Sequence, residues 1–412
     1  MLVTLPVYAK EAVAGGNGKG KLHLWLTDNT HIVDIGPVSD DDAAASSLLY
    51  KSAGSGDNEL IALYEKKKGF GYSQSLVMVS VLLTAQLQRV KEVLETWKKV
   101  DDIVSKLCPS ESAAKDTSPG TPCSPTAKIT DGLVGFLSGN FSDGTWRDEY
   151  LGVNARVTGT AKKTEPSDGV TFHGAWAEWP VGSQGENQLY HFANYNFTLV
   201  ATVSIHGVPT SGSVPLIGVR AGSDGVNKLM ELSYGSGKKW RALCGSENPK
   251  ELSSTWEAEK TYQVAIVLRN GNQGSVYVDG KRVCVSVQSN LANTESKGIS
   301  HFHIGGDGGN AENTAGDEDV SVTVSNVLLY NRPLTFTGGS ADLEEDIASP
   351  SEAPAEQASS QQSRKKREAQ QVPAASSSHA VGEATGDGGI VRGSGLLPLL
   401  LLLLGLWVFA AL

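Results

Sequence analysis

The chain has 412 residues and a mass of 43.4 kDa, which is enough for two or three domains. Its 40% hydrophobic and 19% charged residues exclude a wholly disordered protein, and a net charge of −10 argues against a nucleic-acid partner. The four cysteines are too few for a disulfide scaffold and lack the Cys-x-x-Cys spacing of a zinc site. We predict no metal and no cofactor.

Residues 1 to 83 predict short strands separated by turns rich in glycine and aspartate. Leu22–Leu26 alternates between apolar and other residues, and the further strand candidates are Ser46–Tyr50, Leu60–Tyr64 and Ser75–Leu82. These are too few strands to close a sheet, so the segment is interpreted as the end of a larger β domain.

Residues 84 to 107 predict one long helix. Apolar residues recur at steps of three and four, with one step of seven, at Leu83, Leu87, Val90, Leu94, Trp97, Val104 and Leu107. Lysine and glutamate occupy the opposite face. This pattern favours a rigid connector between two domains over a membrane-surface helix, because the charges alternate in sign.

Residues 108 to 130 form a loop rich in serine, proline and threonine, bracketed by Cys108 and Cys123. In a secreted chain a disulfide between these two cysteines is the natural pairing. The sequence leaves open whether Cys244 and Cys284 pair with each other or remain buried thiols.

Residues 131 to 336 predict a complete β domain. Long strand candidates are Phe197–Ile205, Tyr262–Leu268 and Val320–Tyr330, and an Asp279-Gly280 turn between Ser275–Val278 and Lys281–Ser286 predicts a hairpin. So many strands without a helix suggest two packed sheets, as in a lectin-type jelly roll. Asn140 and Asn196 begin N-glycosylation sequons.

The chain's end predicts a lipid anchor. Residues 337 to 395 have the composition of a disordered stalk. Within it, Arg364–Arg367 is interpreted as a solvated charge run, with a processing site or a basic binding patch as the alternatives. The apolar block Leu396–Leu412 follows a short spacer and small residues around Asp387, which is the predicted glycosylphosphatidylinositol (GPI) attachment residue. A tail-anchored transmembrane helix is the alternative. Such a signal requires secretion, and residues 1 to 8 do not form a signal peptide, so we expect the C-terminal portion of a longer secreted protein.

The stretch Val322-Thr-Val-Ser-Asn-Val-Leu-Leu-Tyr-Asn-Arg332 resembles the VTVxNVxLYNR signature of the trans-sialidase superfamily of trypanosome surface glycoproteins. Further similar stretches are Leu63–Lys68, Asp131–Asn140, Phe197–Val203 and Ile299–Gly306. The resemblance implies a mainly β protein: the end of a sialidase-type β-propeller over residues 1–83, a long connecting helix over 84–107, and a concanavalin-like lectin jelly roll over 131–336.

The resemblance also implies which residues an active enzyme needs. Sialidases hold the substrate carboxylate with three arginines and attack with a tyrosine. The first arginine of this chain is Arg89, inside the predicted helix, and Gln74 stands where the family places the tyrosine. Tyr72, two residues earlier, would need a register shift to replace it. We therefore predict a protein that is not an enzyme; the alternative is a fragment of an active exo-alpha-sialidase or trans-sialidase.

Inactive relatives are implicated in adhesion, so Tyr330, Asn331 and Arg332, at the end of the signature, are the predicted partner-binding residues; packing alone is the competing interpretation. His301 and His303, two apart on a predicted strand and followed by Asp307, could hold a metal ion, but exposed histidines are usually not ligands and we predict no metal site. The sequence thus predicts a non-catalytic, GPI-anchored glycoprotein at the cell surface, which acts in host-cell adhesion or immune evasion. Its predicted partners are host-cell surface proteins or glycans and, through the anchor, the membrane. A decoy antigen without a ligand stays possible.

Overall fold

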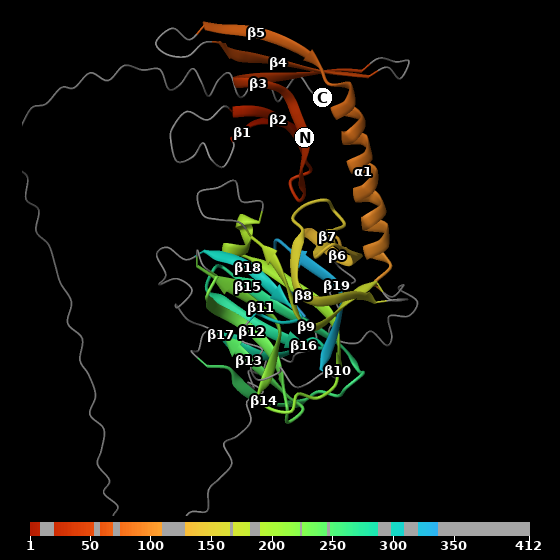
Figure 1. The fold of residues 1–412 in the computed structure, drawn as a ribbon, viewed down its shortest axis with the longest axis vertical. Coiled ribbons are helices and arrows are strands. Elements are labelled where there is room, and N and C mark those ends of the chain that lie inside the picture. Colours follow the sequence, from red (N-terminus) through yellow and green to blue (C-terminus); the bar gives the residue numbers. More distant parts are fainter. Residues whose placement is uncertain are drawn as a thin grey trace, which may run out of the picture. The chain divides into compact units, whose positions relative to one another are not determined.

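The computed structural model describes residues 1–8, 20–52, 58–68, 75–108, 128–164, 168–181, 190–222, 225–244, 248–286, 298–308 and 320–336. Within these ranges the chain is mainly β, with nineteen strands, one α-helix and one short 3₁₀ helix, His191–Asn194 (Figure 1). Hydrogen bonds join the strands into a sheet of five strands, here called the first sheet, and one of fourteen, the second sheet.

The first sheet is antiparallel, and its strands are in sequence order: β1 (Leu2–Tyr8), β2 (Gly20–Thr27), β3 (Ile32–Lys51), β4 (Glu59–Lys68) and β5 (Ser75–Leu82). All four strand candidates lie within these strands, and β5 has the predicted bounds. Strand β3 is 20 residues long and changes partners along its length. Its residues up to Asp42 pair with β2, whereas those from Ala43 onward pair with β4, so one strand joins two hairpins.

Helix α1 (Thr84–Ser105) confirms the predicted helix but corrects its buried stripe. The buried residues are Val90, Val93, Trp97, Val100 and Val104, at alternating steps of three and four. Leu94, which the sequence placed in the stripe, is 41% exposed. It follows Val93 by one position, which turns it about 100° around the helix and away from the packed face.

The second sheet begins after the helix. Its strands are β6 (Leu133–Ser142), β7 (Thr145–Asp148), β8 (Ala155–Thr164), β9 (Gly169–Pro180), β10 (Phe197–His206), β11 (Ser213–Ala221), β12 (Asn227–Gly235), β13 (Lys239–Cys244), β14 (Lys250–Thr255), β15 (Thr261–Arg269), β16 (Gln273–Val278), β17 (Lys281–Ser286), β18 (Ile299–Ile304) and β19 (Ser321–Tyr330). Their spatial order is β14-β13-β12-β11-β18-β9-β8-β7-β6-β19-β10-β15-β16-β17. Positive φ angles at Asp279 (47°) and Gly280 (72°) confirm the tight hairpin turn between β16 and β17.

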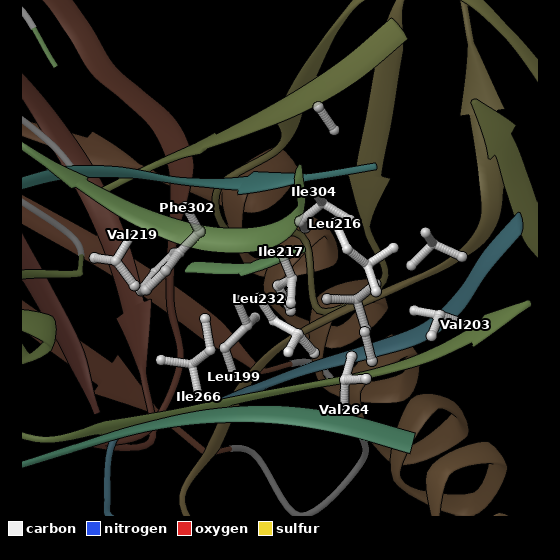
Figure 2. Close-up of a cluster of buried hydrophobic side chains, with 14 of the residues drawn as sticks. Leu199, Val203, Leu216, Ile217, Val219, Leu232, Val264, Ile266, Phe302 and Ile304 are labelled. Atoms are coloured by element: carbon white, nitrogen blue, oxygen red, sulfur yellow. The ribbon is translucent and has the colours of Figure 1, made fainter. Parts of the chain in front are cut away.

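Two arms of the second sheet face each other across a shared core. Figure 2 shows Leu199 and Ile266, from β10 and β15, pointing toward Leu232 and Phe302, from β12 and β18. The Cys244–Cys284 disulfide joins β13 to β17, with Cα atoms 6.2 Å apart, and so answers the pairing that the sequence left open. The expectation of two packed β layers is therefore met in this part of the chain.

A second hydrophobic cluster covers the other face of β6, β10, β15 and β19. It contains Phe136, Val200, Val267 and Leu328 from these strands, together with Trp97 and the rest of the buried stripe of α1. Buried residues of the first sheet belong to the same cluster. These four strands are therefore buried on both faces, because they contribute side chains to two cores.

Candidate functional site

Strand β19, which carries the family signature, changes its environment halfway along. In its first half the strand alternates regularly: Val322 and Val324 are buried in the core of the second sheet, while Thr323 and Ser325 lie half-buried on the outer face. Alternation of this kind is expected for a strand that covers a core on one side only.

A bulge at Asn326 shifts this alternation by one residue. Asn326 has φ of 48°, and the pairing with β10 moves from Thr202–Ser325 to Val200–Leu328 across it. An asparagine tolerates this left-handed conformation better than most residues. Beyond the bulge, Val327 and Leu329 continue into the core of the second sheet, whereas Leu328 and Tyr330 enter the cluster that contains α1.

The bulge corrects part of the predicted binding site. Tyr330 is fully buried, so its side chain is not available to a partner in this structure. Asn331 and Arg332 are half-buried and hold the start of β6: the Asn331 amide donates to the carbonyl of Gly132 (2.8 Å), and Arg332 Nε donates to that of Asp131 (2.6 Å). Packing thus explains most of the signature's C-terminal half.

A row of polar side chains lies on the outer face beside the first half of β19. Thr323 Oγ1 is 2.8 Å from Thr171 Oγ1 on β9 and 2.8 Å from His206 Nε2 on β10. His206 Nδ1 in turn lies 2.8 Å from a Glu259 carboxylate oxygen. The sequence did not single out these residues, because they come from four separate segments and carry no motif.

The described residues contain few of the side chains that sialidase chemistry needs. Gln74 and Tyr72, on which the prediction of inactivity rests, lie outside them. Arg89 is exposed on α1, where its guanidinium is 3.5 Å from the Glu92 carboxylate. No other arginine precedes it in the sequence. The described residues therefore contain no set of arginines in the first sheet that could hold a carboxylate.

His303 and Asp307, two of the three residues of the possible metal site, belong to a buried network of charges. The His303 ring packs against Gly218 of β11 and fills the space that a Cβ there would need, and its Nε2 lies 3.5 Å from Glu231 Oε2. Lys228 bridges Glu231 (2.8 Å) and Asp307 (2.6 Å). Arg220 also pairs with Asp307, at 2.7 Å.

This network keeps His303 neutral. Burial, together with the nearby Arg220 charge, lowers the pKa of His303 to about 3. In the described part of the chain, no group of histidine, cysteine, aspartate and glutamate side chains is arranged to hold a metal ion. We interpret the network as a structural set of ion pairs between β11, β12 and the segment that follows β18.

The two sequons differ in their surroundings. Asn140 is exposed at the end of β6. Asn196 is half-buried, its Oδ1 accepts a hydrogen bond from the Asn270 amide (2.9 Å), and Thr198 of the same sequon is fully buried. Of the two, Asn140 is the more accessible acceptor.

Several predicted features lie partly or wholly outside the described residues. Cys108 is disulfide-bonded, but its predicted partner, Cys123, lies in the loop that is not described. The stalk, Asp387 and Leu396–Leu412 are likewise not described. Among the helices that the structure does describe, none has the length and apolar character needed to cross a membrane.

Three family models match successive parts of the chain, and two curated proteins are similar to it. The family model "Trans-sialidase, C-terminal domain" matches residues 129–337, a "BNR repeat-like domain" matches 1–65, and "Trans-sialidase of Trypanosoma hydrophobic C-terminal" matches 388–412. "Sialidase 85-1.1" of Trypanosoma cruzi is 35% identical over 410 residues, which cover 94% of this chain and 49% of that protein. Another Trypanosoma cruzi "Sialidase" is 35% identical over 338 residues, 81% of this chain and 27% of that protein.

A solved structure shows the same relation. The sialidase of Trypanosoma rangeli in complex with sialic acid is 34% identical, with a TM-score of 0.62, over 81% of this chain and 51% of that one. The fold and the sequence thus define a sialidase-like β protein. The chain belongs to the trans-sialidase superfamily, and it spans about half the length, or less, of these relatives.

Proposed function

We propose that this chain is a non-catalytic, GPI-anchored surface glycoprotein of the trans-sialidase superfamily, which acts in host-cell adhesion or immune evasion. In this proposal the first sheet is the end of a sialidase-type propeller, and the second sheet is a concanavalin-like lectin domain. Family membership and the likeness to a solved sialidase support this arrangement. The alternative is a fragment of an active sialidase.

One observation favours the non-catalytic protein, namely Gln74 immediately before Ser75-Leu76-Val77. The family resemblance puts the nucleophilic tyrosine at this position. A carboxamide has no ionisable oxygen and cannot attack an anomeric carbon in place of a phenolate. Because residue 74 lies inside this chain, the argument holds whatever arginines another part of a longer protein supplies.

A hybrid enzyme tests this argument. The half of the Trypanosoma rangeli sialidase that this chain does not match would be fused before residue 1, and release of sialic acid from a fluorogenic sialoside would be measured. We expect no release from the hybrid and measurable release once Gln74→Tyr is introduced. A Tyr72→Phe change should not alter either result. Release of sialic acid by the unmodified hybrid would refute the proposal, whether or not Tyr72→Phe abolishes that release.

For adhesion, the accessible end of the signature is the best candidate surface. Asn331 and Arg332 remain half-exposed, although Tyr330 does not. The half-buried row of Thr171, Thr323 and His206 lies along the first half of the same strand. Binding of the protein to host cells should therefore fall with Thr323→Ala or Arg332→Ala and persist with Arg156→Ala, an exposed arginine elsewhere on the second sheet.

For the anchor, the match of residues 388–412 to the hydrophobic C-terminal family model supports the lipid-attachment signal. With a signal peptide fused before residue 1, the protein should reach the cell surface. Phosphatidylinositol-specific phospholipase C should then release it. A transmembrane helix would resist the lipase, because the polypeptide itself holds it in the membrane.

A further inference from the structure

The polar side chains on the outer face beside β19 form an unbroken series of hydrogen bonds across four neighbouring strands. Thr164 Oγ1, at the end of β8, lies 2.7 Å from Thr171 Oγ1, which lies 2.8 Å from Thr323 Oγ1. Thr323 Oγ1 lies 2.8 Å from His206 Nε2, and His206 Nδ1 lies 2.9 and 2.8 Å from the two Glu259 oxygens. These five residues are here called the polar row.

The direction of each hydrogen bond in the polar row follows from the hydrogens that the side chains own. The Glu259 side chain is 70% exposed, and a carboxylate can only accept. A neutral His206 therefore donates from Nδ1 to Glu259 and accepts at Nε2. Thr323 must then give its single hydroxyl hydrogen to His206 and accept from Thr171, which in turn accepts from Thr164.

This arrangement leaves the polar row with acceptors and no free hydrogen. A hydroxyl group has one hydrogen and two lone pairs, so Thr171 and Thr323 each keep one unused lone pair. The exposed Glu259 carboxylate keeps further acceptor positions. A ligand must therefore supply the hydrogens itself. An ammonium, guanidinium, amide or hydroxyl group does so, whereas a carboxylate, phosphate or sulfate would meet only lone pairs and the charge of Glu259.

The charges on this face favour a cation at one end of the polar row. Within the described ranges Glu259 forms no ion pair with a lysine or an arginine, and the nearby Lys260 already pairs with Glu257 (3.1 Å). At the other end, Lys162 of β8 is exposed and lies directly opposite Thr171 in the β8–β9 register, so the two residues share a face. A positive charge is thus attracted at Glu259 and repelled at Lys162.

We propose that the polar row binds a cationic hydrogen-bond donor, a lysine or arginine side chain of a partner protein. The cation lies at Glu259, and a neighbouring donor of the same partner lies at Thr323. The uncompensated charge of Glu259 favours a cation over a neutral sugar, because hydrogen bonds between charged groups are the stronger ones. This inference rests on the proposed adhesive function and names the chemistry of the partner, a basic protein segment and not an acidic glycan.

Equilibrium binding of short peptides to the full-length chain, at pH 8 and low ionic strength, tests the proposal. The probe is a capped hexapeptide of alternating arginine and serine. Glu259→Gln should weaken its binding about tenfold, because a charge-assisted hydrogen bond is lost. Thr323→Val keeps the side-chain shape but removes the acceptor, and should weaken binding about threefold. Lys162→Ala should strengthen binding, because it removes the repelling charge.

Two control variants separate the polar row from the overall charge of the chain. Glu251→Gln removes an exposed carboxylate on β14, elsewhere on the second sheet. Thr158→Val replaces an exposed threonine on β8 that makes no hydrogen bond among the described residues. Neither variant should change the affinity for the peptide.

Equal losses with Glu259→Gln and Glu251→Gln would overturn the proposal, since binding would then follow net charge alone. Weaker binding with Lys162→Ala would also overturn it, because a cation gains when Lys162 is removed. A glutamate–serine peptide or lactose that binds, and loses binding with Thr323→Val, would assign the polar row to an acidic partner or a glycan instead.

The same variants keep this inference separate from the proposed function. If the arginine peptide shows the expected pattern while Thr323→Ala leaves host-cell binding unchanged, the chemistry of the polar row is supported and only the adhesive function fails. If host-cell binding falls with Thr323→Ala but the arginine peptide binds all variants equally, the inference fails and the adhesive function stands.

Discussion

The two sheets differ in how much apolar surface they leave uncovered. Among the described residues, the first sheet and the residue before it expose ten large hydrophobic side chains: Met1, Leu5, Val7, Tyr8, Leu49, Tyr50, Leu63, Val77, Met78 and Leu82. The much larger second sheet exposes two, Tyr195 and Val226, if its connecting loops are included. A sheet needs a second layer for each apolar face. The second sheet supplies its own layer, whereas part of the first sheet has none.

The largest effect expected from this difference is in the folding of the separate parts. Residues 125–338, expressed alone, should give a β-type circular dichroism spectrum and a cooperative thermal transition, because they contain a complete core. Residues 1–83 alone should aggregate or stay unfolded. A random-coil spectrum of the longer piece, or a cooperative melt of the shorter one, would break the comparison.

A smaller effect is expected where α1 joins the two sheets. Trp97→Ala removes a buried indole and its hydrogen bond to Tyr150, which should cost about 3–5 kcal/mol. Because the first sheet depends on this contact, we expect it to unfold at lower urea concentration while the second sheet keeps its transition. Leu94→Ala, on the exposed face of the same helix, should change stability by less than about 0.5 kcal/mol. Equal effects of the two variants would contradict the assigned stripe.

The smallest effect concerns pH, and two buried groups of the second sheet oppose each other. The folded-state pKa of Asp148 is raised to about 7. Its contribution to the free energy of unfolding is therefore present at low pH and is lost as the pH rises toward 7. The pKa of His303 is lowered to about 3, so its contribution is present above 6.5 and is lost as the pH falls. Each changes the free energy of unfolding by about 1.4 kcal/mol per pH unit.

Between about pH 4.5 and 6.5 the two slopes should largely cancel, leaving about zero net slope from this pair. Relative to the unmodified chain, His303→Gln should become more stable as the pH falls, and Asp148→Asn should become less stable. Urea unfolding at three pH values measures both differences. Parallel dependences of the unfolding free energy on pH in all three proteins would contradict this prediction. They would show that neither Asp148 nor His303 causes a pH response of the second sheet.

Local patterns predicted the elements well where one residue type decides the geometry. The bounds of β5 and the Asp279-Gly280 hairpin follow from β-branched runs and from a turn that needs two positive φ angles. The helix was predicted, but its stripe was not fully assigned. Val93 and Leu94 are equally apolar neighbours, and only the packing partner decides which of them is buried.

What the sequence could not predict depends on contacts between distant segments. Cys244 and Cys284 meet because β13 and β17 face each other across a core, which no spacing reveals. Tyr330 looked accessible at a strand end, yet the second hydrophobic cluster covers it. The buried Asp148 and the polar row carry no motif, and their contacts come from separate parts of the chain.

The bulge at Asn326 makes the length of the signature strand as important as its composition. Six of the ten residues contribute side chains to the two cores, and the extra residue sets which core each residue beyond it enters. Deleting Asn326 would turn Val327 and Leu329 away from the core that they now fill, reversing the facing of every residue up to the strand end. Substitutions at Ser321, Thr323 and Ser325 touch neither core. Natural diversification of this strand can therefore proceed by exchanging outward residues, but not by gaining or losing one.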